Sequence, residues 1–297
     1  MGGEKPDEKG ESPLPASIDA PRLADAPAAS IASGYAAGRP ETVSEYLEWA
    51  KATLSVDFSD PKVSRLYNLN AAAVQDAVRQ STFVQTLLDA FTTADKEYLA
   101  SHKERLFMSE VQGVDIKKKP YQSAVEKTFR LNVLWNRKFP KPPHDGWITP
   151  ENWFARLDDI VRTAIVCRFL DGPSFLCKEL ESHAGRCGAQ GNTVARGIDE
   201  GYYAHHFYVT CDVDVLVGAS GNPTSQTTKL EVQVTTQLQE ILRSLTHQYY
   251  ESDRVRRKDL EWTWKFKTNK FRARFLGHSL HLLEALIVDV RDHREDE

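Results

Sequence analysis

The chain has 297 residues, a formal net charge of -4 and an apolar fraction of 41%, a composition typical of a globular protein. This balance gives no global nucleic-acid signal, so any contact with RNA must use a local basic patch. No run approaches the roughly 20 apolar residues that a membrane helix needs. The four cysteines form no CxxC pair, which disfavours a zinc or disulfide framework. We therefore expect a reduced, cytoplasmic protein without membrane contact.

Residues 1–42 are rich in Ala, Pro, Ser and Gly and contain almost no aromatic residues. Such a segment buries too little apolar surface to offset its loss of entropy on ordering, so we predict a disordered tail. An N-terminal helical segment follows over 43–112. Its first helix would be capped by Thr42 or Ser44, and apolar residues at helical spacing predict a second run from Val74 to His102.

The segment 113–251 alternates between helical and strand patterns. The pattern predicts, in chain order, a helix from Gln122, a buried strand from Asp159, a helix ending near Gly185, a strand from His205, a turn over 218–226, a strand from Lys229 and an amphipathic helix. Residues 252–297 form a C-terminal helical extension, in which His278 and His281 are expected to be packed rather than metal-bound. This order predicts an α+β fold with a small mixed central sheet flanked by helices.

A basic loop at 117–119 leads into the start of a helix that carries Ser123, Lys127 and Arg130. Lysines neutralise phosphate charge, and a helix N-terminus offers free N–H donors, so the arrangement suits a polyphosphate. Taken alone, however, a run of lysines is more often a solvated loop.

Two acids and one aromatic segment also carry chemistry. Asp159 opens an apolar strand, where a carboxylate can hold Mg²⁺ on nucleotide phosphates or simply solubilise the strand edge. Glu231 and Gln233 share one face of their strand. A charge inside a sheet needs a partner, which Mg²⁺ or a substrate hydroxyl could supply unless that face is exposed. Tyr202 could stack on a base or pack in the core.

Taken together and in this order, the segments resemble the synthetase domain of the RelA/SpoT family over roughly Gly113 to Tyr250. The family's basic loop, serine and following lysine correspond to Lys117, Lys119, Ser123 and Lys127. Its strand aspartate corresponds to Asp159, its Gly-Tyr-x-x-x-His motif to Gly201, Tyr202 and His206, and its Glu-x-Gln strand to Glu231 and Gln233. The resemblance implies a nucleotidyltransferase-like RelA/SpoT synthetase fold.

The resemblance also implies an activity, the transfer of pyrophosphate from ATP to a 3′-hydroxyl. It assigns the ATP phosphates to Lys119, Ser123 and Lys127, and we expect Lys117 and Arg130 of the same basic segment to contribute to ATP binding. It makes Asp159 and Glu231 the catalytic residues and the Mg²⁺ ligands, with Glu231 also the base for the attacking hydroxyl. It assigns the acceptor base to Tyr202, and we expect Tyr203, His206 and Gln233 to contribute to acceptor binding as well.

Some positions depart from the family pattern. Ala164 stands where the family usually has an arginine, and Tyr203 replaces the arginine that usually follows the stacking tyrosine. The acceptor is therefore open between a guanosine nucleotide (GTP or GDP, giving (p)ppGpp) and the tRNA 3′ end, the substrate of translation-inhibiting toxins. The residues within these motifs resemble those of single-domain members of the family, including toxic ones, and this favours the tRNA 3′ end as the acceptor.

Two further questions stay open at this stage. Basic residues between Arg254 and Arg274 could hold an RNA backbone. Ala164 supports the alternative of a catalytically impaired module that binds a nucleotide or a partner. The helices outside the core could serve as a lid, an oligomer surface or an antitoxin site.

Overall fold

The computed structural model of the chain describes residues 38–196, 201–218, 221–254 and 265–293, with the backbone alone for 246–254. Contacts divide the chain into two units, Met1–Gly38 and Arg39–Glu297, and every element described below belongs to the second. Residues 1–37 of the predicted disordered tail lie outside the described residues. The last residues of that tail make contacts, because Arg39 donates a hydrogen bond to the Asn136 carbonyl and Thr42 caps the first helix.

Four helices form the N-terminal segment: α1 Val43–Leu54, α2 Pro61–Gln80, α3 Thr82–Gln85 and α4 Leu87–His102. The run expected from Val74 to His102 is therefore broken, and the break lies at Ser81. The Ser81 hydroxyl donates to the Val78 carbonyl at 2.7 Å and accepts from the Val84 N–H at 3.4 Å. A side chain that bonds the backbone in this way ends one helix and caps the next.

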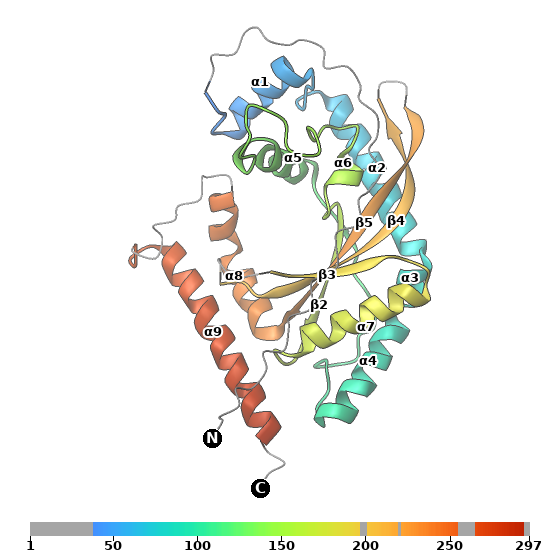
Figure 1. Cartoon of the computed structure of the whole chain (residues 1–297), viewed down its shortest axis with the longest axis vertical. Helices are drawn as coiled ribbons and strands as arrows, with labels where there is room; N and C mark the ends of the chain where they lie inside the picture. Colours follow the sequence, from blue (N-terminus) through green and yellow to red (C-terminus); the bar gives the residue numbers. More distant parts are fainter. Residues whose placement is uncertain (1–37, 197–200, 219–220, 255–264, 294–297) are drawn as a thin grey trace, which may run out of the picture. The chain divides into compact units, whose positions relative to one another are not determined.

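A five-stranded mixed sheet lies at the centre of the unit (Figure 1). Its strands are β1 Lys117–Lys118, β2 Val161–Cys167, β3 Gly191–Arg196, β4 Ala204–Val217 and β5 Asn222–Thr236, in the order β1-β2-β5-β4-β3. β2 and β5 are parallel and the other pairs are antiparallel. The expected mixed sheet flanked by helices is confirmed. The turn expected over 218–226 is too long, because β5 already pairs with β4 from Asn222 onwards.

The remaining helices complete the fold. They are α5 Tyr121–Phe129 with its π-helical continuation η1 Arg130–Leu134, α6 Trp153–Arg156, α7 Gly172–Arg186, α8 Gln237–Arg254 and α9 Asn269–Asp292. α9 begins earlier than its apolar run, because the Thr268 hydroxyl accepts from the Phe271 N–H at 3.2 Å and caps it. None of the described helices has both the length and the apolar composition needed to cross a membrane.

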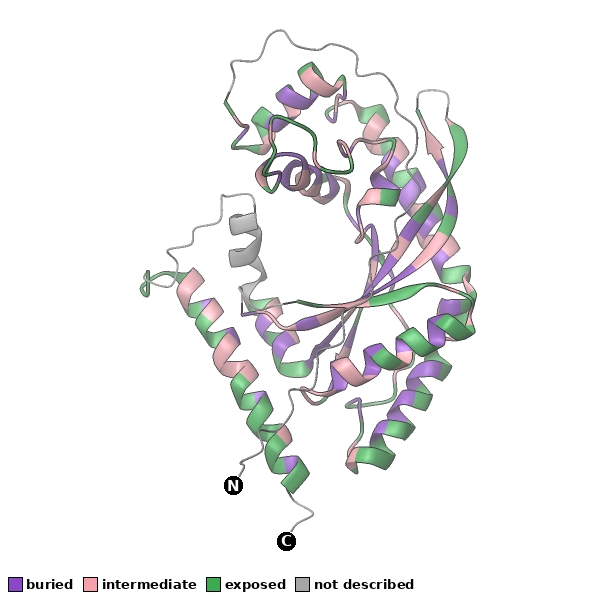
Figure 2. Ribbon diagram, viewed as in Figure 1, coloured by how far each residue is buried: buried purple, intermediate pink, exposed green. Residues whose placement is uncertain are grey.

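The two faces of the sheet differ in chemistry, although both belong to strands that carry buried residues (Figure 2). One face belongs to the hydrophobic core and presents side chains such as Ile165, Val232 and Phe207, packed with residues of α2 and α7. Because side chains alternate along a strand, the residues between them point to the other face. That face is polar, and it carries Arg162, Glu231, Gln233, His206 and Tyr208.

Candidate active site

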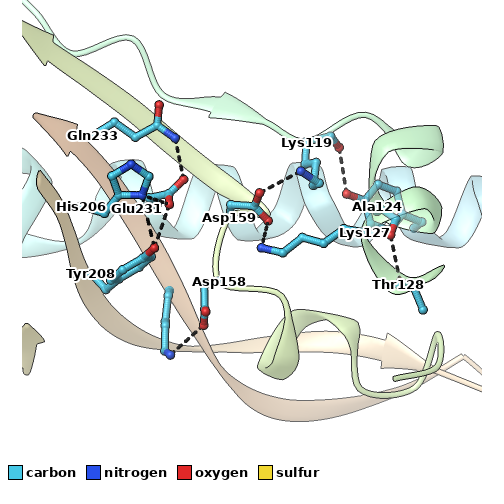
Figure 3. Close-up of polar contacts among 12 residues, drawn as sticks. Lys119, Ala124, Lys127, Thr128, Asp158, Asp159, His206, Tyr208, Glu231 and Gln233 are labelled. Carbon is cyan, nitrogen blue, oxygen red and sulfur yellow. Dashed lines mark hydrogen bonds and ion pairs between the residues drawn. The ribbon is translucent and has the colours of Figure 1, made fainter. Parts of the chain in front are cut away.

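A carboxylate held by two lysines lies at the start of β2. Lys119 Nζ lies 2.8 Å from Asp159 Oδ2, and Lys127 Nζ lies 2.7 Å from Asp159 Oδ1 (Figure 3). Lys119 is fixed by its backbone, whose N–H donates to the Ile160 carbonyl at 2.7 Å and extends the β1–β2 pairing. Lys127 reaches the same carboxylate from α5. Three separate segments therefore meet at Asp159.

This cluster is largely removed from water. The exposed fractions of the Lys119, Lys127 and Asp159 side chains are 7%, 18% and 15%. Burial alone would raise the pKa of Asp159, but the two ammonium groups outweigh it and hold that pKa well below its ordinary range. Burial also lowers the pKa of Lys119, against the opposing effect of Asp159. The lysines thus form a partly desolvated cationic pair, which is the chemistry that binds phosphate oxygens.

A second carboxylate lies on the neighbouring strand β5 and is bonded on both oxygens. Glu231 Oε1 lies 2.8 Å from His206 Nδ1 and accepts from the Tyr208 hydroxyl at 2.9 Å. Glu231 Oε2 accepts from the Gln233 amide at 2.9 Å. The strand register explains the cluster, since Tyr208 is the β4 partner of Glu231 and His206 is the partner of Gln233.

Three donors keep Glu231 ionised in a buried position. Burial raises the pKa of Glu231, while the hydrogen bond and charge of His206 lower it, and the net result is a pKa below the ordinary value. A carboxylate can only accept here, so Nδ1 of His206 must carry its proton. Nε2 of His206 is buried and has no hydrogen-bond partner among the described residues. The carboxylate is oriented and charged, as a general base or a metal ligand must be.

The pair of carboxylates fits a magnesium–nucleotide complex. Asp159 and Glu231 are close enough for the charge of Asp159 to raise the pKa of Glu231, so a cation between them would relieve their repulsion. Within the described residues, no group of three or more His, Cys, Asp and Glu side chains forms a complete metal site. Two carboxylates suffice for Mg²⁺, which usually takes one or two from the protein and further oxygens from substrate phosphates.

The other residues predicted to contact ATP are Lys117, Ser123 and Arg130. Lys117 is exposed on β1 and lies 3.2 Å from Asp115. Ser123 is half-buried in the first turn of α5. Arg130 is buried, with its guanidinium over the Trp135 ring at 5.7 Å from the ring centroid. Of the predicted phosphate contacts, the structure therefore brings Lys119 and Lys127 together around Asp159.

The two tyrosines predicted to contact the acceptor are placed differently from each other. Tyr202 is half-buried just before β4. The Tyr203 ring stacks on His281 of α9, with centroids 3.6 Å apart, and its hydroxyl lies 2.7 Å from His278 Nδ1. The two histidines are thus packed against a tyrosine. Tyr203 presents one ring face to α9, while His206 and Gln233 lie beside Glu231.

Position 164 can also be judged from the register. Ala164 is exposed on β2 and pairs with Gln233, and Arg162 pairs with Glu231. Arg162 shares the polar face and is close enough to Lys119 to contribute to the lowered pKa of that lysine. A positive charge is therefore retained on β2 near the site, two residues before Ala164.

The sequence reasoning did not single out Tyr208, although it contacts Glu231 directly. A usable signal was present, because Tyr208 follows His206 by two residues and must share its strand face. Its importance depends on the β4–β5 register, which the sequence alone does not give. Asp158, the chain neighbour of Asp159 (Figure 3), pairs with Lys229 at 2.7 Å.

No known family profile matches this sequence, and no curated protein matches it. Among solved structures, the chain is similar to the small alarmone synthetase 1 of Bacillus subtilis, at 18% identity with a TM-score of 0.42 over 72% of this chain and 93% of that one. It is also similar to the small alarmone synthetase 2 of the same organism, at 16% identity with a TM-score of 0.42 over 70% and 93%.

A GTP pyrophosphokinase family protein from Streptococcus pneumoniae is similar as well, at 16% identity with a TM-score of 0.41 over 74% of this chain and 95% of that chain. These three solved structures are thus two small alarmone synthetases and a GTP pyrophosphokinase family protein.

Proposed function

We propose that this chain is a pyrophosphokinase that moves the β,γ-pyrophosphate of ATP onto a 3′-hydroxyl. The observation that carries the proposal is the presence of two buried clusters, one just before β2 and the other on its parallel neighbour β5. One is the Asp159 carboxylate between Lys119 and Lys127, and the other is the Glu231 carboxylate with three hydrogen-bond donors. The first has the chemistry to bind polyphosphate, and the second has the chemistry to accept a proton.

The lysine cluster would bind the phosphates. Without a nucleotide the ammonium groups of Lys119 and Lys127 share the single carboxylate of Asp159, which leaves one positive charge unbalanced within these three side chains. A bound triphosphate brings several anionic oxygens, and the lysines can turn toward them. Phosphoryl transfer depends mainly on positioning and charge neutralisation, and both would come from groups that the fold already holds in place.

Mg²⁺ would be held by Asp159 and Glu231 together with phosphate oxygens, and when bound it would neutralise charge on the transferred group. The protein residues supply the remaining chemistry. Glu231 accepts the proton of the attacking 3′-hydroxyl, the new bond joins that oxygen to the β-phosphorus, and the bond from the β-phosphorus to the bridging α-oxygen breaks. AMP is the leaving group, and no oxidant or reductant is required.

For the acceptor, we propose the tRNA 3′ end ahead of a free guanosine nucleotide. Tyr202 has an aromatic face that can stack on any base. The next residue, Tyr203, carries no charge for the phosphates of a free nucleotide and is stacked on His281. Lys265 and Lys267 are exposed before α9 and could contact an RNA backbone. Residues 255–264 of the predicted RNA-binding stretch lie outside the described residues.

The acceptor proposal is tested by replacing Tyr202 with Ala. Stacking contributes roughly 1–3 kcal/mol per base, so the Michaelis constant for the acceptor should rise about 5- to 150-fold. The Michaelis constant for ATP should stay nearly unchanged, because the lysines lie on other segments. A variant that loses affinity for ATP and acceptor equally would contradict this role of Tyr202.

The competing hypothesis of a catalytically impaired binding module rests on Ala164. It predicts nucleotide binding without turnover, whereas the pyrophosphokinase proposal predicts AMP from ATP only when an acceptor is present. Supplying deacylated tRNA, GDP or GTP in turn separates the possibilities. Label from the γ-phosphate on tRNA supports the tRNA acceptor, label on a free nucleotide supports the alarmone acceptor, and bound but unchanged ATP supports the binding module.

A further inference from the structure

The polar face of the sheet carries a row of side chains that crosses four strands. Lys117 of β1 is the register partner of Arg162 on β2, and Arg162 is in turn the partner of Glu231 on β5. The row ends on β4, where Tyr208 is the partner of Glu231. Side chains of register partners point to the same face of a sheet. Arg162 therefore lies between the basic loop and the carboxylate proposed as the base.

Arg162 has no fixed partner on this face, although it is half-buried. Among the described residues, its side chain donates no hydrogen bond and forms no ion pair. None of its nitrogens is a buried atom without a partner, so the guanidinium is open to a ligand. A guanidinium carries five N–H donors and keeps its charge. Arg162 thus offers a charge and donors that the described residues do not use.

The carboxylate on the next strand does not take up these donors. Both oxygens of Glu231 are already bonded by three other side chains, those of His206, Tyr208 and Gln233. An arginine opposite an acid on a neighbouring strand would ordinarily pair with it. Here the other donors hold the carboxylate, so the guanidinium of Arg162 is left for a different anion.

The surroundings of Arg162 carry an excess of positive charge. Lys119 and Lys127 share the single carboxylate of Asp159. The pKa of Lys119 is lowered chiefly by burial, and the nearby charge of Arg162 adds to the lowering. Like charges that a fold holds together repel each other, and a bound polyanion relieves that repulsion. These three cations therefore indicate a ligand with several negative charges.

The position of Arg162 decides which part of such a ligand it would meet. Figure 3 shows Asp159 between the two lysines and the Glu231 cluster. Asp159 lies just before β2, whereas Arg162 lies inside β2 and opposite Glu231. With the phosphates of ATP on the lysines and the attacking hydroxyl at Glu231, the group that moves lies between these two clusters. Arg162 is the cation on the Glu231 side, where the new bond forms.

We propose that Arg162 is a catalytic residue that binds the pyrophosphoryl group while it is transferred, an inference that rests on the proposed function. Its guanidinium donates two N–H groups to non-bridging phosphate oxygens, in the paired geometry in which arginine binds phosphate. The contact neutralises charge on the moving group, and Arg162 keeps its proton while Glu231 accepts that of the hydroxyl. The resemblance does not assign this contact, because the arginine of the family pattern falls on Ala164.

Turnover and ATP binding, measured separately on the full chain, test the proposal. Removing one donor to charge that develops in a transition state usually lowers kcat about 10²- to 10³-fold, and Arg162→Ala should show a loss of that size. The dissociation constant for ATP with Mg²⁺, measured by calorimetry without acceptor, should rise less than about tenfold, because Lys119 and Lys127 still hold the phosphates. Arg162→Lys keeps the charge and loses the paired geometry, so its kcat should fall between those of the wild type and Arg162→Ala.

The matched control is Arg65→Ala. Arg65 is exposed on α2, so this variant removes the same side chain away from the site and should keep the wild-type kcat. Thermal denaturation separates a catalytic role of Arg162 from a structural one. Because Arg162→Ala removes no hydrogen bond or ion pair among the described residues, its melting temperature should stay within a few degrees of the wild type.

The outcomes separate the role of Arg162 from the proposed function. A wild-type protein that transfers pyrophosphate while Arg162→Ala keeps the same kcat would overturn the role of Arg162 and leave the proposed function standing. A loss confined to ATP affinity would overturn it too, because Arg162 would then contact the ground state alone, and so would a loss of kcat that accompanies a large drop in melting temperature. A wild-type protein without any transfer would contradict the proposed function itself, and the role of Arg162 with it.

Discussion

Asp159 and Glu231 are both buried carboxylates, but their surroundings differ. Asp159 is bonded by two cations, whereas Glu231 is bonded by an imidazole, a phenol and an amide. A group between two cations is a poor proton acceptor and a good anchor for positive charge. A carboxylate held by three donors that can reorient accepts a proton at a smaller cost in free energy. The residue environments therefore favour Glu231 as the base.

Replacing Glu231 with Gln should reduce transfer by roughly 10²- to 10⁴-fold, the usual contribution of a general base, and leave the fold intact. Replacing Asp159 with Asn should also abolish transfer. It should cost about 3–5 kcal/mol of unfolding free energy as well, because two buried ammonium groups lose their partner. Turnover measurements and chemical denaturation separate the two effects.

Asp158→Asn is the matched control for Asp159→Asn. Its carboxylate pairs with Lys229 at 2.7 Å, but both side chains are about 40% exposed, and such surface pairs contribute at most about 1 kcal/mol. We expect near-native stability and activity. Equal losses in the Asp158 and Asp159 variants would show that the predicted metal and phosphate anchor is misassigned.

The pH profile tests the environment of Glu231. Its pKa lies below the ordinary value of 4.5, so its charge persists as pH falls and is lost only below that value. In His206→Ala the largest lowering influence disappears while burial still raises the pKa. The acid limb of the pH–rate profile should therefore move to higher pH. An unchanged acid limb would contradict the pairing of His206 with Glu231.

At the scale of elements, the strand register brings the site together. β5 pairs with β2 on one side and with β4 on the other, so Glu231 lies between Arg162 and Tyr208. The strands that carry these residues were predictable, because their apolar residues are β-branched and alternate with polar ones. The side chains of Lys119 and Lys127 converge because β1 pairs with β2 and α5 follows at once.

Other elements could not be predicted from local sequence. β1 has two residues and no strand pattern of its own, and it forms because β2 offers an edge. β3 is mostly polar and forms by pairing with β4. The exposure of the apolar residues of α9 could not be predicted either, since an apolar helical stripe is normally assigned to the core. In each case tertiary partners override the local pattern.

The close approach of α9 to the backbone at Gly201 gives a prediction for the stability of this helix. Gly277→Ala should destabilise the protein, because its Cβ would lie 1.8 Å from a backbone oxygen. Gly185→Ala in α7 is the matched control, since nothing lies within 4 Å of its Cβ. There alanine should be neutral or stabilise by up to about 1 kcal/mol. Thermal denaturation compares the two, and equal melting temperatures would contradict the close approach of α9 to Gly201.

On the scale of the whole molecule, different surfaces of the described chain carry different features. The apolar face of the sheet holds the core, the polar face carries the candidate site, and α9 contacts the loop at Gly201 and Tyr203 while it leaves apolar residues exposed on its outer side.

The central claim is that ATP is cleaved between its α- and β-phosphates and that the pyrophosphate is transferred. Incubation of the full chain and Mg²⁺ with ATP labelled in the adenine ring and at the γ-phosphate follows both fragments, in the presence of deacylated tRNA, GDP or GTP. We predict AMP in equal amount to γ-label on the acceptor, and roughly 10²- to 10⁴-fold slower formation of both with Glu231→Gln. Formation of ADP with free phosphate, or of AMP without label on any acceptor, would contradict the account.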